Sequence, residues 1–112
     1  MKDTISFDDF AKLNLCVGTI VAVEKVPQAD KLYRLEVDLG KAVGKRQLVS
    51  GITAEYTPEQ LQDKQIVVLA NPAAKEIRGV ESQGMLLAAV KDDGEAVLLQ
   101  PEKKVLEGTK IS

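Results

Sequence analysis

The sequence contains no histidine and no tryptophan, a single cysteine and few aromatic residues, which make up 4% of the chain. Because histidine is the commonest general base and metal ligand, its absence argues against a zinc site and against a nucleophile paired with an imidazole. No glycine-rich loop ending in Gly-Lys-Ser or Gly-Lys-Thr is present to hold a phosphate. We therefore predict a protein that is not an enzyme and that uses no metal and no other cofactor.

The one cysteine, Cys16, lies in the apolar run LNLCVGTI, which predicts a buried and unreactive thiol. A single cysteine cannot form an intramolecular disulfide, which fits a reducing compartment. The first ten residues, MKDTISFDDF, lack the basic start and apolar stretch of a signal peptide. No apolar run is long enough to span a bilayer, so we predict a cytoplasmic protein with no membrane contact.

Charge is unevenly distributed along a chain whose net charge is −2. Residues 41–50 hold three basic residues and no acidic one, and residues 64–91 hold four basic and two acidic residues. The acidic balance argues against indiscriminate binding of nucleic acid. If the two basic segments meet in space, however, they form a local cationic patch on an acidic body.

The 112 residues, 45% of them hydrophobic and 29% charged, predict one domain over residues 1–112. Strands are indicated at 15–26, where Gly18 suggests a bulge, and at 32–40, where apolar and polar residues alternate. Further strands are expected at 46–52, 64–71, 84–90 and 96–101, with another extended piece near the C-terminus. Helices are indicated after Ser6 and at 57–63, and residues 71–79 read as a loop.

Short strands, tight turns and one helix between the third and fourth strands predict an all-β fold. This order is that of the OB-fold, a closed five-stranded barrel, here with extra strands at the C-terminus. OB-folds bind oligonucleotides on one face and in the adjoining loops.

The segment 71–85 offers the groups that RNA binding needs, namely cations for phosphates and amides or hydroxyls for base edges and 2′-OH groups. Each of these residues also has an ordinary structural explanation, such as a turn cap, a solvated charge, a core side chain or a charged edge strand. What favours binding is that they lie at the ends of different strands, which a barrel brings together. Because aromatic residues are few, we expect recognition of shape and backbone rather than continuous base stacking. The candidates from this segment and from the basic run before it are Lys45, Arg46, Asn71, Lys75, Arg78, Ser82 and Gln83.

Four segments in this order, ADKL, RQLVSGI, YTPEQLQDKQIVVLAN and RGVESQGMLLAA, resemble the dimeric tRNA-binding domain family. That domain occurs as a free-standing bacterial protein and at the C-terminus of many methionyl-tRNA synthetases, and it has chaperone-like relatives linked to secretion. The resemblance covers roughly residues 7–112. It implies an OB-fold, a homodimer formed through the N- and C-terminal segments, and non-catalytic recognition of tRNA by its overall shape. The binding residues that it implies are Lys31, Ser50, Asn71, Arg78, Ser82, Gln83 and Met85.

The chain departs from the family pattern after the fourth strand, where NPAAKEI replaces a segment that carries more lysines, so that Ala73 and Glu76 stand at cationic positions. Fewer phosphate contacts reduce both affinity and its dependence on salt. Two alternatives to tRNA binding therefore stay open. One is binding of unfolded peptides, and the other is docking onto an aminoacyl-tRNA synthetase.

Overall fold

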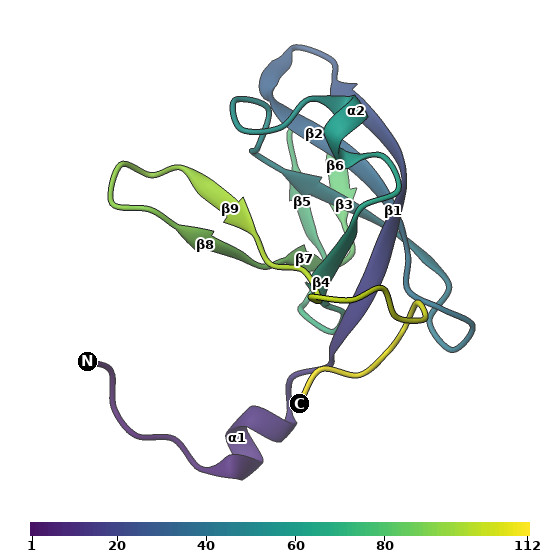
Figure 1. Cartoon of the computed structure of the whole chain (residues 1–112). Coiled ribbons are helices and arrows are strands. Elements are labelled where there is room, and N and C mark those ends of the chain that lie inside the picture. The colour runs from purple at the N-terminus through teal and green to yellow at the C-terminus, as the bar shows by residue number, and fades with distance from the viewer.

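The computed structural model describes all of residues 1–112 and contains two short helices and nine strands (Figure 1). None of its helices is both long and apolar enough to cross a membrane. In chain order the elements are α1 (Phe7–Ala11), β1 (Leu15–Val26), β2 (Ala29–Asp38), β3 (Lys45–Ser50), α2 (Pro58–Leu61), β4 (Gln65–Leu69), β5 (Lys75–Ile77), β6 (Val80–Ser82), β7 (Met85–Leu86), β8 (Ala88–Val90) and β9 (Ala96–Leu98).

Five strands form an antiparallel sheet in the order β3-β2-β1-β4-β7. The long strand β1 pairs with β4 through its first half and with β2 through its second half. The bulge that we predicted at Gly18 lies further along, between Ile20 and Ala22. Gly18 serves packing instead, since a Cβ there would lie 2.5 Å from Val37 Cγ1 and 2.6 Å from Leu39 Cδ2.

The sheet is open, because its edge strands, β3 and β7, do not pair with each other. The prediction of a closed barrel is therefore wrong at this seam. A single backbone hydrogen bond crosses this seam, from Gln83 N–H to Gln47 O at 2.7 Å. Side chains supply the rest, because Gln47 N–H donates to Gln83 Oε1 and Val49 N–H donates to the Ser82 hydroxyl. Only Gln83 and Gly84 lie between β6 and β7, and this short link offers β3 too few main-chain groups for a continuous row of hydrogen bonds.

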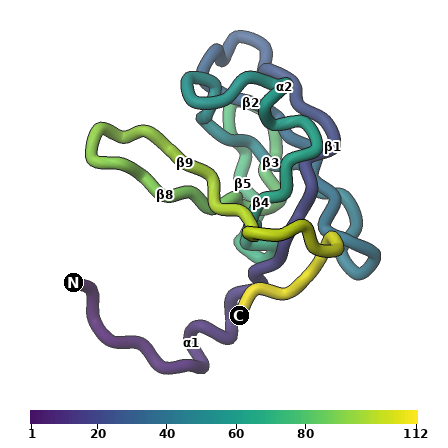
Figure 2. The backbone as a smooth tube through the Cα atoms, in the orientation of Figure 1, coloured from purple at the N-terminus to yellow at the C-terminus, as the bar shows by residue number.

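Two regions differ from the sequence-based expectation. The predicted loop at 71–79 contains β5, which pairs with β6 in a hairpin whose turn residues Arg78 and Gly79 both have positive φ. The predicted strand 84–90 is split at Leu87, whose N–H bonds Val67 O while its carbonyl accepts from Leu99 N–H. As a result β7 stays in the main sheet, whereas β8 pairs with β9 in a hairpin that projects from the body (Figures 1 and 2).

The core is built on the alternating part of β2, as predicted, because Tyr33, Leu35 and Val37 are buried and the residues between them are partly exposed. Tyr33 is buried, and its hydroxyl donates a hydrogen bond to Tyr56 O at 2.7 Å.

Cys16 is also buried, and burial raises the pKa of its thiol although the Arg46 charge acts in the opposite direction. The thiol is therefore protonated at neutral pH, which agrees with the inert cysteine expected from the sequence. The core cluster comprises Cys16, Ile20, Tyr33, Leu35, Val37, Leu39, Leu48, Ile52, Leu61, Ile66, Val68, Ala70 and Leu98.

The C-terminal segment runs along the first half of β1, on the side that β2 leaves free. Val17 exchanges two backbone hydrogen bonds with it, donating to Thr109 O at 2.9 Å and accepting from Gly108 N–H at 2.8 Å. Glu107 accepts a hydrogen bond from the Thr19 hydroxyl at 2.7 Å, and this bond lowers the pKa of the Glu107 carboxyl. The predicted extra C-terminal extended piece is thus present as a tail bonded to β1.

The N-terminal segment lies outside the body of the fold. Ser6 caps α1 as predicted, accepting a hydrogen bond from Asp9 N–H, but no residue of this helix is buried. The chain before it extends away from the sheet (Figure 2). Apolar side chains in this part, such as Ile5 and Phe7, are therefore largely exposed within one copy of the chain.

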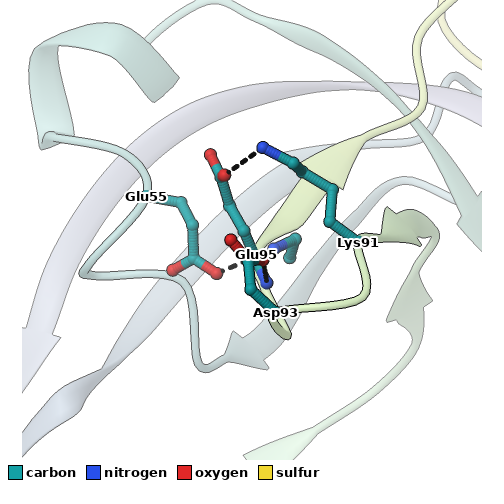
Figure 3. Close-up of polar contacts among 5 residues, drawn as sticks. Glu55, Lys91, Asp93 and Glu95 are labelled. Atoms are coloured by element: carbon teal, nitrogen blue, oxygen red, sulfur yellow. Dashed lines mark hydrogen bonds and ion pairs between the residues drawn. The ribbon is translucent and has the colours of Figure 1, made fainter.

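The loop between β3 and α2 holds the projecting hairpin β8–β9 (Figure 3). The Glu55 carboxylate accepts a hydrogen bond from Ala96 N–H at 2.9 Å, bridging the loop to the first residue of β9. Within the hairpin Lys91 pairs with Glu95 at 2.7 Å, and Glu95 N–H donates to the Asp93 carboxylate. The hairpin is thus both internally bonded and tied to the body.

Candidate functional site

A groove lies between the end of β3 and the hairpin β5–β6, with the start of β7 between them. Its volume is about 330 Å³. The lining residues come from three separate segments, 49–51, 72–77 and 82–86, which agrees with the expectation that strand ends would meet here. They are Val49, Ser50, Gly51, Pro72, Ala73, Lys75, Ile77, Ser82, Gly84, Met85 and Leu86.

The lining of this groove combines an apolar surface with a few polar groups. Met85 is 55% exposed although it is apolar, and Ile77 and Leu86 are partly exposed beside it. Lys75 is the one charged residue of the lining, which contains no carboxylate. The Ser50 hydroxyl is half-buried in the groove and makes no hydrogen bond within the chain. An anionic ligand with a flat apolar part is the chemistry that such a lining suits.

Two more cations lie next to the groove. Lys31 and Arg78 share a second hollow, formed by residues 28–32 and the turn of the hairpin. The two hollows adjoin, since a Cβ on Gly51 would lie 3.6 Å from Lys31 O. Lys31, Lys75 and Arg78 are exposed, and none of them takes part in the ion pairs of the chain. Three unpaired positive charges therefore surround this end of the molecule.

Arg46, another predicted contact, is bonded within the protein. Its guanidinium donates to Ala70 O at 3.2 Å and to Gln83 O at 3.0 Å, so it connects β3 to the segments that follow β4 and β6. Asn71 is similarly engaged, since its side chain accepts from Asn14 N–H and donates to Lys12 O, both at 2.8 Å. These bonds give both residues structural partners, and their contact with a ligand stays a prediction.

Ser82 and Gln83 underlie the groove. The buried Ser82 hydroxyl accepts from Val49 N–H at 3.0 Å and donates to Gly84 O at 3.1 Å, which uses its donor. Gln83 bonds Gln47 through both its backbone and its side chain. Gly84 is required by packing, because a Cβ there would lie 3.3 Å from Leu69 O and close to the Leu48 side chain. These residues shape the wall of the groove.

Lys45 lies apart from the other candidates. It begins β3 whereas Ser50 ends it, a separation of roughly 17 Å along an extended strand. Its ammonium group is 3.8 Å from the Glu36 carboxylate, an exposed pair. The predicted residues that the structure gathers around the groove with free side chains are therefore Lys31, Ser50, Lys75, Arg78 and Met85.

Comparison with known families identifies the chain. The family described as "Putative tRNA binding domain" matches residues 15–110, nearly the whole length. The chain belongs to this tRNA-binding domain family. The resemblance inferred from ADKL, VSGI and ESQGM is thus confirmed.

Several relatives of this tRNA-binding domain are parts of a synthetase. The chain is 55% identical to methionine–tRNA ligase of Pyrococcus horikoshii over 108 residues, which is 96% of this chain but 14% of the ligase. Two solved structures are matched over their whole length. A MetRS-related protein from P. horikoshii superposes with a TM-score of 0.91 at 33% identity over 99% of this chain, and chaperone CsaA from Bacillus anthracis with 0.89 at 38% over 98%.

Sequence reasoning missed several parts of the groove in this tRNA-binding domain. Pro72, Ala73, Ile77 and Leu86 line it, yet their apolar character gave no reason to select them. A signal for the hairpin was present, since Arg78-Gly79 stands between two apolar β-branched residues in the arrangement typical of a two-residue turn. Recognising that turn would have made residues 75–82 one wall of a groove rather than a loop.

Proposed function

We propose that this tRNA-binding domain binds tRNA without catalysing a reaction, recognising its shape and backbone at the groove and the adjoining hollow. The observation that carries the proposal is the cluster of three unpaired cations, Lys31, Lys75 and Arg78, around a groove whose lining has no carboxylate. Such groups bind phosphates while hydroxyls and apolar surface contact the nucleosides. Family membership and the synthetase relatives support the same conclusion.

The proposal includes the architecture and setting of the domain. A sheet ordered β3-β2-β1-β4-β7, with α2 between β3 and β4, supports a single OB-type unit over residues 1–112 whose open seam is bridged by side-chain hydrogen bonds. Two copies would associate through the N- and C-terminal segments, where exposed apolar side chains gather. Two linked sites would raise the affinity of a weak patch through effective concentration. The proposed setting is the cytoplasm, where tRNA is found.

The test is a titration of bulk tRNA over a salt series with three proteins: the wild type, Lys75→Ala and Lys41→Ala. Both lysines are exposed and outside any ion pair, but Lys41 is in the turn between β2 and β3, away from the groove lining. We expect salt-sensitive binding by the wild type. Lys75→Ala should make the slope of log affinity against log salt less negative by about one, and Lys41→Ala should leave it unchanged. Absence of salt-sensitive tRNA binding near physiological salt would refute the proposal.

A second candidate function is peptide binding. It is favoured by the apolar part of the groove and by the likeness to chaperone CsaA. Apolar contacts persist at salt concentrations that remove RNA from a cationic surface, so the same salt series separates the two functions. Docking onto a synthetase is a further role suggested by the ligase relatives, of which the chain matches a small part. Co-purification with such an enzyme would reveal it.

A further inference from the structure

We propose that the groove between β3 and the hairpin β5–β6 holds one unstacked nucleotide of the RNA, with its base against the apolar wall and its phosphate at Lys75. This inference rests on the proposed function, since it assumes that RNA is the ligand. It differs from recognition of shape and backbone because it requires a base that has left its helix.

The dimensions of the groove fit a single nucleotide. Its volume of about 330 Å³ is near the lower end for small-molecule pockets, so it admits one flat group and excludes a double helix. It is lined by Ser50 and Gly51 on the β3 side and by Lys75 and Ile77 on the hairpin side, whereas Val49 and Ser82 are joined by a hydrogen bond at 3.0 Å and leave no room between them. A base inserted between them would be covered on both faces, as splayed-out bases are in sequence-specific RNA complexes.

The lining offers a suitable group for each part of a nucleotide: the base, the sugar and the phosphate. Met85, Ile77 and Pro72 supply polarizable and apolar surface, and a thioether makes favourable contacts with flat ring systems. The free Ser50 hydroxyl can donate to or accept from a base edge or a 2′-OH group. Lys75 supplies the positive charge for the phosphate, and Arg78 at the tip of the same hairpin extends it to a neighbouring phosphate.

Charge also favours a nucleotide over a peptide as the occupant. The groove has a cation and no carboxylate, and the adjoining hollow contains two cations, Lys31 and Arg78, against one acid, Asp30. This balance attracts an anionic chain and gives no particular advantage to an unfolded peptide. A peptide occupant is therefore left as an outcome of the experiment.

The walls are set before the ligand arrives. Ser82 is bonded to Val49 and Gly84, Gln83 is bonded to Gln47, and Arg46 fixes the carbonyls of Ala70 and Gln83. These bonds hold the hairpin and β3 at a fixed separation and leave Ser50, Lys75 and Met85 free for the ligand. A preformed site reduces the entropy lost on binding.

The experiment compares two RNAs, bulk tRNA and a fully paired RNA duplex of similar length, with the wild type, Met85→Gln and Met85→Leu. Met85 is 55% exposed, so both variants should fold, and melting curves check this. We expect Met85→Gln to weaken tRNA binding by about fivefold, within the range for losing one contact between a thioether and a flat ring, with the salt slope unchanged. Met85→Leu should keep most of the affinity, and duplex binding should be the same for all three proteins.

Ser50→Ala provides an independent variant, which should weaken tRNA binding without altering the binding of duplex. The nucleotide site is overturned if Met85→Gln and Ser50→Ala bind tRNA as the wild type does, and in that case the proposed tRNA-binding function still stands. It is also overturned if Met85→Gln weakens binding of an unfolded apolar peptide and not of tRNA. If the wild type shows no salt-sensitive tRNA binding at all, the proposed function fails together with this inference.

Discussion

The Arg46 guanidinium donates to two backbone carbonyls, Ala70 O and Gln83 O, that belong to segments far from it in sequence. A basic residue after Lys45 in a polar-looking strand was expected to face RNA. Its hydrogen bonds give it structural partners at the seam where the sheet is open, and its contact with RNA stays a prediction. For a single basic residue, the role therefore depends on which hydrogen-bond acceptors the fold brings near it.

Replacing Arg46 by alanine should destabilise the domain by about 2 kcal/mol, because two buried or half-buried carbonyls lose a charged donor. Urea denaturation measures this change. For protein that remains folded, the salt slope of tRNA binding should stay at the wild-type value. A slope that is less negative by about one, without any loss of stability, would instead assign Arg46 to a phosphate.

Glu107 gives the domain a stability that depends on pH. The hydrogen bond from the Thr19 hydroxyl lowers the pKa of its carboxyl below the ordinary value of 4.5. Because the folded-state pKa is lowered, the Glu107 carboxylate contributes fully to the free energy of unfolding above its unfolded-state pKa. This contribution is lost as the pH falls through the folded-state pKa.

We therefore expect Glu107→Gln to be less stable than the wild type at neutral pH, with the difference shrinking as the pH is lowered below 4.5. Melting temperatures measured from neutral to acidic pH test this. Glu102→Gln is the matched control, since Glu102 is an exposed acid of the same segment without a hydrogen bond in the chain. Equal pH profiles for Glu107→Gln and the wild type would show that the bond to Thr19 contributes nothing.

Among the elements, the hairpin β8–β9 depends most on contacts made by a loop. Glu55 accepts from Ala96 N–H, and the Tyr56 hydroxyl accepts from Leu98 N–H at 3.1 Å, so adjacent loop residues bond both ends of β9. The Tyr56 carbonyl in turn accepts from Tyr33 in the core. The direction in which the hairpin projects is thus fixed by residues 55–56.

Glu55→Ala should release the start of β9 and cost about 1 kcal/mol, because Ala96 N–H loses its acceptor. Amide hydrogen exchange should show faster exchange at Ala96 and little change in β1. Glu95→Ala is the control from the same hairpin (Figure 3), since it removes an exposed ion pair with Lys91, which contributes little. Equal exchange at Ala96 in both variants would contradict the role given to Glu55.

Elements with strong local patterns were predicted from the sequence. The alternation of β2 and the capping residues Ser6 and Thr57 fixed their positions to within a few residues. The hairpin β5–β6 was missed because its strands have three residues each and a polar composition. The break at Leu87 was missed because GMLLAAV is continuously apolar, and only the pairing of Leu87 with Val67 and Leu99 divides it.

For the site, sequence reasoning selected suitable residue types but could not assign their partners. Ser82 and Gln83 have the groups that bind RNA, yet the structure uses those groups to join the hairpin to β3. Ser50 and Lys75 have the same kinds of groups and are free. The difference arises from tertiary contacts across more than thirty positions, which local sequence does not specify.

For the whole molecule, exposed apolar side chains concentrate in the parts that project from the sheet. Ile5 and Phe7 lie in the N-terminal segment, Val97 in β9 with Leu99 just after it, and Leu106 in the C-terminal segment. We infer that these side chains are the contacts of the proposed homodimer, because they have no cover within one copy of the chain.

Val97→Asp should convert the proposed dimer into a folded monomer, because a charge on an apolar contact surface is left without a partner. Analytical ultracentrifugation gives the mass, and the tRNA affinity of the monomer should fall because two sites no longer act together. Asp92→Ala, in the turn of the same hairpin, should remain dimeric. A wild-type protein that sediments as a monomer at micromolar concentration would refute the homodimer.

The tail that follows Glu107 has a consequence for handling the protein. Gly108, Thr109 and Ile111 occupy the backbone groups of Leu15 and Val17 that would otherwise form a bare strand edge. Bare edges are the sites at which sheets of separate molecules join and precipitate. Removing the residues after Glu107 should therefore expose this edge and favour aggregation of the domain.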